Sequence, residues 1–322
     1  MNKIKALTIS ATLLALLLAG CNSKKNDSTQ DNDKYDYVLL AQPVVSAVLS
    51  QKSNFKVSNN VQTDYKVKSN NLEITQASIF VKSDLEETKV NSFLAMIKND
   101  VATLMASPDT VLPSALEGVE EQLISSKLGG KLQLITNLLK NGDQIGLGYK
   151  EALANKASID AFIGTLGMPA TTEEKYYSIS EAEASTSLNL KVAVPAGAPA
   201  TAFYNHLKDS NLEVAAADTV LAYLDNSSNK DVVIAPTNAG LAAINKGLNM
   251  KLAATITFGN FFVVSTGNDN NDVMDKGDKV LAFQENGVGG KLFKYVYGDR
   301  ELDITYVKDA AAVKNIVLTE DY

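Results

Sequence analysis

The sequence predicts an α/β protein with doubly wound sheets and a circularly permuted chain order. Short apolar segments alternate with helical segments over residues 190–318, the pattern of mainly parallel sheets. The last strand and helix, 302–307 and 308–318, have no strand after them, and the first strand, 35–41, has no helix before it. These two incomplete units make one βαβ crossover together. Residues 37–40 are therefore expected to form an interior strand beside 304–307 or 280–283.

The N-terminal residues predict secretion and anchoring. Lys3 and Lys5 precede an apolar run over 6–18, which is too short to span a membrane. Leu18-Ala19-Gly20-Cys21 resembles the lipobox of bacterial lipoproteins, in which the cysteine is lipidated; an ordinary secretion signal is the alternative. We expect residues 1–20 to be a lipoprotein signal peptide and Cys21 to be the lipidation site, on the outer face of a bacterial membrane.

Polar residues fill the segment that follows Cys21. Residues 21–34 contain no large apolar side chain and are expected to form a disordered tether. Loss of the two lysines of the signal peptide takes the formal net charge from −7 to −9. This acidic balance argues against nucleic acid as a partner.

Helical patterns dominate the middle of the chain. After a predicted strand at 76–81, apolar residues recur at helical spacing over 90–104, and further helices are predicted at 113–128, 132–139 and 158–166. Residues 84–170 are thus expected to be a helical segment. Residues 178–189 hold Ser, Glu, Ala and Thr without periodicity and read as a linker.

The second half alternates strands and helices. Predicted strands lie at 190–194, 232–235, 252–257, 261–265 and 280–283. Helices are expected at 200–207, after 238 up to Gly247, and at 291–296. In such sheets ligands bind at the carboxyl ends of the parallel strands.

Several of these segments are similar to the ABC-importer solute-binding proteins of the thiamine-precursor, sulfonate and nitrate group. The similar segments are 191–198, 233–238, 245–247, 251–255, 258–260, 282–287 and, out of order, 36–43, 76–82 and 175–177. The resemblance implies a type II periplasmic-binding fold. It also implies a continuous lobe over 76–266, a lobe split between 35–75 and 267–322, and hinge crossovers near Thr75 and Gly267.

Candidate ligand-binding residues follow the predicted strands. They are Pro195, Ala196, Gly197, Ala198, Thr237, Asn238, Asn260, Phe261, Gln284, Glu285, Asn286, Gly287, Gln42 and Gln76. The turn 284–290 precedes a helix, so its amides could hold a polar ligand group, although Glu285 disfavours an anion. Glycine there could serve turn geometry alone, and Thr237 and Asn238 could be helix N-caps.

Catalytic and metal-binding patterns are missing from the sequence. His206 is the only histidine, Cys21 is the only cysteine, and there is no Gly-x-Ser-x-Gly motif. The aspartates of 269–278 do not match the EF-hand spacing. We therefore expect no enzyme activity, no cofactor and no metal.

The expected function is extracytoplasmic solute binding. A monomeric lipoprotein would capture a small molecule between its lobes and deliver it to an ABC permease. Heteroaromatic or sulfonate-like solutes are the ligands that the resemblance implies. A sensory or scavenging lipoprotein without a transporter is the alternative, and a hydrolase on a similar scaffold is a third reading.

Overall fold

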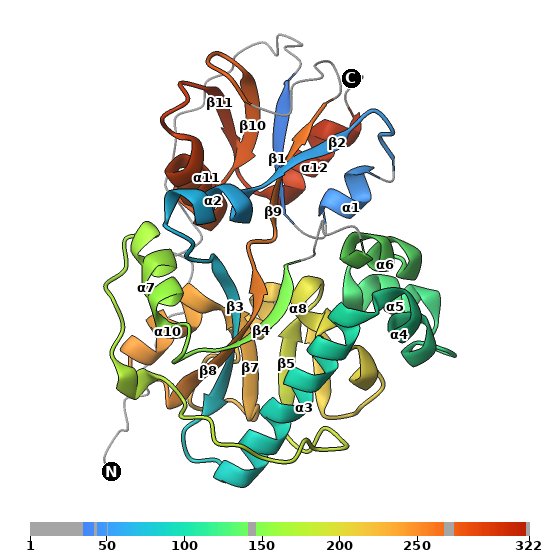
Figure 1. The fold of residues 1–322 in the computed structure, drawn as a ribbon, viewed down its shortest axis with the longest axis vertical. Coiled ribbons are helices and arrows are strands. Elements are labelled where there is room, and N and C mark those ends of the chain that lie inside the picture. Colours follow the sequence, from blue (N-terminus) through green and yellow to red (C-terminus); the bar gives the residue numbers. More distant parts are fainter. Residues whose placement is uncertain (1–34, 42–43, 50, 141–145, 267–273, 320–322) are drawn as a thin grey trace, which may run out of the picture.

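The strands form two mixed sheets that lie one above the other in Figure 1. The computed structural model describes residues 35–41, 44–49, 51–140, 146–266 and 274–319. Its strands are β1 (Tyr37–Ala41), β2 (Lys56–Asn60), β3 (Thr75–Lys82), β4 (Leu147–Glu151), β5 (Val192–Pro195), β6 (Leu212–Ala215), β7 (Val232–Pro236), β8 (Met250–Phe258), β9 (Phe261–Ser265), β10 (Lys279–Phe283) and β11 (Asp303–Val307). A mixed α/β fold is thereby established.

The six-stranded sheet has the order β4-β8-β3-β7-β5-β6. β6, β5 and β7 run parallel, whereas β3 is antiparallel to both of its neighbours, β7 and β8. β4 pairs antiparallel with β8 at the edge. The sheet is therefore mixed, and its antiparallel strands β3 and β4 depart from the parallel order that the sequence pattern predicted.

The five-stranded sheet has the order β11-β10-β1-β9-β2. β11, β10 and β1 run parallel, and β9 is antiparallel to both β1 and β2. β1 is an interior strand whose Tyr37 pairs with Val280 of β10 on one side and with Ser265 of β9 on the other. The predicted place of residues 37–40 beside 280–283 is confirmed.

Helices cover both faces of each sheet. They are α1 (Val44–Leu49), α2 (Val61–Lys68), α3 (Glu87–Ala106), α4 (Pro108–Ala115), α5 (Glu121–Leu128), α6 (Leu132–Lys140), α7 (Lys156–Thr165), α8 (Ala198–Thr201), α9 (Ala217–Leu221), α10 (Thr237–Asn245), α11 (Val288–Tyr297) and α12 (Ala310–Thr319), with short 3₁₀ turns at Glu173–Lys175 and Tyr204–His206. α1 packs with α12, and α2 packs with α11 (Figure 1).

Two apolar cores follow from the alternation of side chains along β3. Ile79 points into a core with Phe93 of α3 and Leu112 of α4. Phe80 points the other way, into a core that includes Phe162 of α7 and continues to the five-stranded sheet. α7 thus joins one face of the six-stranded sheet to the five-stranded sheet.

The chain passes between the sheets at two places. One passage is the link from α2 to β3, which starts at Thr75. The other is Gly259–Asn260, because β8 belongs to the six-stranded sheet and β9 to the five-stranded one. The predicted boundary at Thr266, with a crossover near Gly267, is therefore misplaced by one strand: five buried residues, 261–265, looked like a continuation of the preceding sheet.

The predicted helical segment 84–170 is interrupted by β4. Gly146 has φ +68°, and a Cβ atom there would lie 2.5 Å from the carbonyl oxygen of Phe258. Glycine is needed at this close approach, which brings Leu147 opposite Thr257 of β8. The predicted helix 200–207 is also wrong, because only α8 and one 3₁₀ turn form there.

The predicted linker 178–189 has no regular structure and crosses the outside of α3, where Ser185 N–H donates to the carbonyl oxygen of Ser92 at 3.0 Å. None of the helices within the described ranges combines the length and apolar character that crossing a membrane requires.

Candidate functional site

The carboxyl ends of the parallel strands of both sheets meet where the chain passes between them. Ala41, at the end of β1, pairs with Phe261, which is three residues beyond the end of β8. In the six-stranded sheet, Ala77 of β3 pairs with Pro236, the last residue of β7. We define the crossover junction as Gln62, residues 74–77, residues 236–238 and residues 257–261. It is the edge at which ligands bind in open α/β sheets.

Five of the predicted site residues lie in the crossover junction. Gln76 Oε1 accepts the N–H of Asn260 at 2.9 Å, which ties β3 to the second passage of the chain. Thr237, fully buried, lies 2.7 Å from Ser78, hydroxyl to hydroxyl, and Ser78 lies 3.1 Å from Thr255. The N-cap of α10 is Pro236, so Thr237 and Asn238 do not have the alternative role of N-caps. Phe261 is buried beside Phe283, with ring centroids 6.0 Å apart.

The turn formed by Pro195, Ala196, Gly197 and Ala198 is bound to other parts of the protein. Gly197 has φ +105°, and its N–H donates to the carbonyl oxygen of Lys127 in α5 at 3.0 Å. Ala196 N–H donates to Ala215 at 2.9 Å. These two amides are therefore used structurally, and ligand contact by this turn stays a prediction.

The turn formed by Gln284, Glu285, Asn286 and Gly287 follows β10 and precedes α11. Gly287 N–H donates to the carbonyl oxygen of Gln284 at 2.8 Å, and Gln284 N–H donates to Val307 at 2.9 Å. The side chains of Glu285 and Asn286 are exposed. Of the remaining predicted residues, Gln42 and Cys21 lie outside the described residues.

Buried polar atoms without a hydrogen-bond partner gather at the crossover junction. Eight such side-chain atoms occur among the described residues, and five belong to this junction. They are Gln62 Nε2, Thr75 Oγ1, Asn238 Oδ1, Thr257 Oγ1 and Asn260 Oδ1. Leaving a buried polar group unpaired costs about 1–3 kcal/mol, so these five atoms favour a partner from outside the protein, either water or a ligand.

Gly259 brings the polar atoms of the two passages together. It has φ +52°, and a Cβ atom there would lie 2.5 Å from the Cβ of Gln62. Gln62 Oε1 accepts the N–H of Ile74 at 2.8 Å, and Gly259 N–H donates to the carbonyl oxygen of Ile74 at 3.1 Å. The two passages are therefore in direct contact, and any larger residue at position 259 would separate them.

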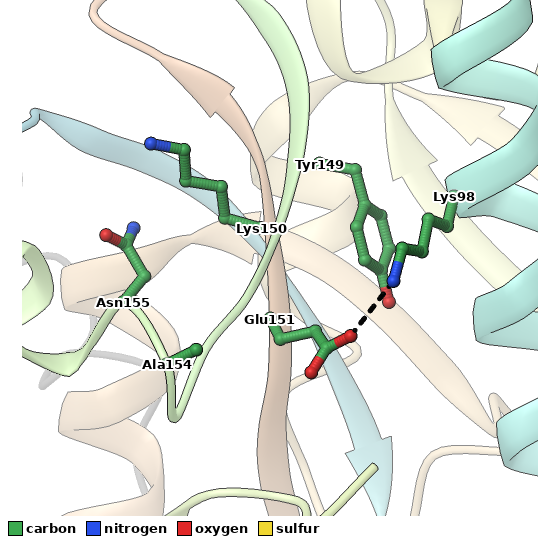
Figure 2. Close-up of a pocket in the computed structure, with 6 residues that line it drawn as sticks. All are labelled: Lys98, Tyr149, Lys150, Glu151, Ala154 and Asn155. Atoms are coloured by element: carbon green, nitrogen blue, oxygen red, sulfur yellow. Dashed lines mark hydrogen bonds and ion pairs between the residues drawn. The ribbon is translucent and has the colours of Figure 1, made fainter. Parts of the chain in front are cut away.

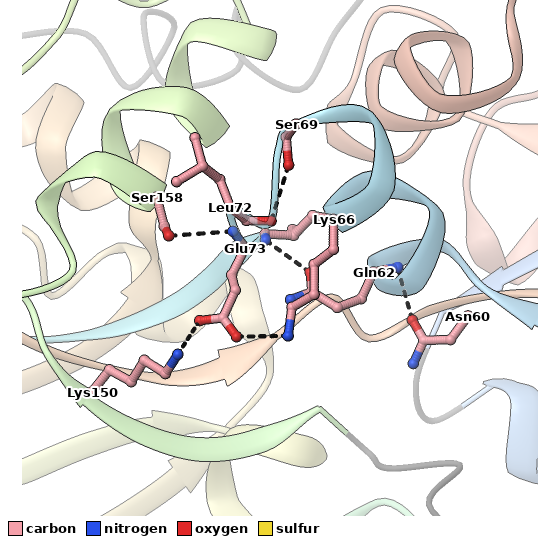
Figure 3. A network of polar contacts seen from close by, with 9 residues as sticks. Asn60, Gln62, Lys66, Ser69, Leu72, Glu73, Lys150 and Ser158 are labelled. Atoms are coloured by element: carbon pink, nitrogen blue, oxygen red, sulfur yellow. Dashed lines mark hydrogen bonds and ion pairs between the residues drawn. The ribbon is translucent and has the colours of Figure 1, made fainter.

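A charged network borders the junction (Figure 3). Glu73, only 9% exposed, contacts Lys66 of α2 at 2.9 Å and Lys150 of β4 at 2.6 Å. Its N–H donates to Ser158 Oγ of α7 at 3.2 Å. Burial alone would raise the pKa of Glu73, but the hydrogen bonds from Lys150 and Lys66 outweigh burial and hold the pKa below its usual value. Glu73 thus binds Lys66 from the helix that packs on the five-stranded sheet and Lys150 from the edge strand of the six-stranded sheet.

A shallow pocket of about 310 Å³ lies along the edge strand β4 and shares Lys150 with the charged network (Figure 2). Lys98 and Tyr149 lie on one side of β4, with Lys98 paired to Glu151 at 3.2 Å, and Lys150 and Asn155 lie on the other. None of the predicted site residues lines it. Within the described ranges, no group of His, Cys, Asp and Glu is arranged to hold a metal.

The sequence reasoning missed Gln62, Glu73, Thr75, Lys150 and Thr257. For Thr257 the signal was a threonine within the largely apolar segment 252–257, and for Thr75 it was a polar residue at the start of the strand segment 75–81. The other three had no signal. Comparisons of the chain with protein families, with curated proteins and with solved structures give no match. The resemblance to solute-binding proteins therefore stays a prediction.

Proposed function

We propose that the protein is an extracytoplasmic solute-binding lipoprotein that captures a small molecule at the crossover junction. The observation that carries the proposal is the set of unpaired buried polar atoms at the point where both sheets present the carboxyl ends of their parallel strands. A bound solute would supply the missing hydrogen bonds from both sides.

The strand order supports a two-lobe architecture with a hinge. Each sheet contains three parallel strands, then an antiparallel strand, then a fourth strand parallel to the first three, and the six-stranded sheet adds β4 at its edge. In each sheet the antiparallel strand is supplied by the chain as it returns from the other sheet. Two similar units joined by two passages can rotate about those passages and close on a ligand.

The same order supports circular permutation. In the six-stranded sheet the three parallel strands follow one another along the chain as β5, β6 and β7. Their counterparts in the five-stranded sheet are β10, β11 and β1, so the third comes from the opposite part of the sequence. α12 packs on β1 and β10, the place of a crossover helix between β11 and β1. The tether that precedes β1 therefore joins the lipid anchor to the five-stranded unit.

A thermal-shift screen of the full chain against small polar solutes tests capture. A solute at a hundred times its dissociation constant adds about 2.7 kcal/mol to the free energy of unfolding. We expect at least one solute to raise the melting temperature with one-to-one stoichiometry by calorimetry. A screen in which heteroaromatic, sulfonate and carbohydrate solutes all leave the melting temperature unchanged would contradict capture.

Delivery to an ABC permease is the second half of the proposal. Deletion of the protein should abolish uptake of the solute found in the screen, and a variant with Cys21→Ser should restore less uptake than the original chain. Undiminished uptake in the deletion strain would contradict delivery while leaving capture intact.

A further inference from the structure

The crossover junction also indicates the charge of its ligand. Building on the proposed function, we infer that the captured solute is an uncharged molecule that carries both hydrogen-bond donors and acceptors, such as a polyol, an amide or a neutral heterocycle.

The unpaired atoms define this complementarity. Gln62 Nε2 can only donate, whereas the Oδ1 atoms of Asn238 and Asn260 can only accept. The hydroxyls of Thr75 and Thr257, both fully buried, can do either. All five groups are neutral, so a ligand that satisfies them needs N–H or O–H groups as well as acceptor oxygens or nitrogens.

The charged groups at the border of the junction are already paired with each other. Both carboxylate oxygens of Glu73 are engaged, one by Lys66 at 2.9 Å and the other by Lys150 at 2.6 Å. Figure 3 shows both lysine side chains directed at Glu73. An anion that recruited either lysine would leave the carboxylate of a 9%-exposed residue with half of its partners.

Glu285 is a further charged group near the junction, and it disfavours anions as well. Glu285 follows β10, whose last residue, Phe283, lies against Phe261 of the junction. Its exposed carboxylate would repel an anion, and exposure leaves it too well solvated to hold a cation strongly. Burial of either kind of ion beside five neutral groups leaves the charge without a compensating partner, a cost that a neutral ligand avoids.

Two buried aromatic rings border the junction, Phe261 within it and Phe283 beside it. Phe261 and Phe283 are 5% and 4% exposed and form a tilted aromatic pair. An uncharged ring or carbon skeleton can pack on these rings while its polar groups reach the threonines and amides. The arrangement therefore selects hydrogen-bonding pattern and shape rather than charge.

The test fractionates a small-molecule extract of a rich growth medium by charge. Anion-exchange and cation-exchange resins divide the extract into an unretained neutral fraction and two eluates, and each is added to the full chain in a thermal-shift assay. We expect the neutral fraction to raise the melting temperature and the two eluates to leave it unchanged. A shift with an eluate alone overturns the inference but supports capture. The absence of a shift with the unfractionated extract contradicts capture itself, and the inference with it.

A variant with Thr75→Val and Thr257→Val connects the response to the junction. These substitutions remove two unpaired hydroxyls at nearly constant volume, and we expect at least a tenfold higher amount of the neutral fraction to be needed for the half-maximal shift. The matched control is Thr136→Val on α6, a buried threonine whose hydroxyl bonds to Leu132, and its response should stay within twofold. An unchanged response of the double variant overturns the assignment, and the wild-type fractionation remains decisive if that variant does not fold.

Discussion

The two sheets have the same strand order, but the chain supplies their strands differently. The parallel strands of the six-stranded sheet come from one stretch of sequence, whereas those of the five-stranded sheet come from residues 37–60 and 279–307. Both sheets nevertheless place an antiparallel strand between their third and fourth parallel strands. The comparison teaches that the order of strands in a sheet depends on the apolar faces of the strands and on the helices that cover them. The places along the sequence where the chain begins and ends have less influence on that order.

The sheets also differ in the elements that lie outside their shared strand order. Among the described residues, only the six-stranded sheet has an extra edge strand, β4, and a group of helices, α3 to α6, over one face. The pocket of Figure 2 lies on this extra strand and has no counterpart position in the five-stranded sheet. The unpaired polar atoms of the junction, in contrast, lie where the shared parts of both sheets meet. This contrast favours the junction over the pocket as the functional site.

The largest effect is expected from the helix that completes the five-stranded unit. Val313 and Val317 of α12 are fully buried, so Val313→Ala combined with Val317→Ala should lower the free energy of unfolding by about 4 kcal/mol. Urea titration measures this loss. Val67→Ala on α2, where the side chain is 82% exposed, is the matched control and should change nothing measurable. Equal stability of all three proteins would show that α12 is not part of the unit.

A smaller effect is expected at the network that joins the two units. Glu73→Gln removes the charge that holds Lys66 and Lys150, and should cost about 2 kcal/mol, because both lysines can still reach water. The exposed pair of Glu86 with Lys89 provides the control, and Glu86→Gln should leave stability unchanged. A loss as small as that of the control would mean that Glu73 does not connect the units.

The pH dependence of this network has a defined sign. The pKa of Glu73 is lowered by folding from its ordinary value of 4.5, so its stabilising contribution is present above about pH 4.5 and is lost as the pH falls through the folded-state pKa. The stability difference between the wild type and Glu73→Gln should therefore shrink in urea titrations taken from pH 7 down to pH 3. A difference that stays constant over this range would rule out the carboxylate as its source.

The smallest effect is expected from moving the chain ends into residues 178–189. A chain that begins at Ala184, ends at Glu183 and joins residues 322 and 35 by a flexible linker restores consecutive order in the five-stranded sheet. Because residues 178–187 lie mostly at the surface, its stability should stay within about 1 kcal/mol of the natural chain in urea titrations, with ligand response retained. New ends between Gly259 and Asn260 should prevent folding. Folding of the second chain but not the first would refute the proposed permutation.

The predictability of the elements followed the strength of their apolar pattern. β9 was predicted at its observed bounds because Phe261–Ser265 is a run without charges. β10 begins one residue before its predicted start and ends where it was predicted to end. β4 was missed because Leu147–Glu151 has one large aliphatic residue, and its position depends on how closely Gly146 approaches Phe258. Sheet membership of β9 was also missed, since an apolar strand fits either sheet equally well.

The candidate site was predictable only in part. Strand ends gave Thr237, Asn238 and Asn260, because the carboxyl edge of a sheet is a general ligand position. The roles of Thr75, Thr257 and Gln62 depend on the missing partners of their side chains, a property of three-dimensional packing that no sequence spacing encodes. Glu73 and Lys150 are 77 positions apart, and nothing in their local sequence joins them.

The most direct test of solute capture is hydrogen–deuterium exchange of the full chain with and without the small-molecule extract. Capture at the crossover junction predicts slower exchange in peptides that cover residues 74–77, 236–240 and 257–262, with little change over β4 and α7. Protection confined to residues 149–155, around the pocket of Figure 2, or an exchange pattern that the extract does not alter, would contradict the account.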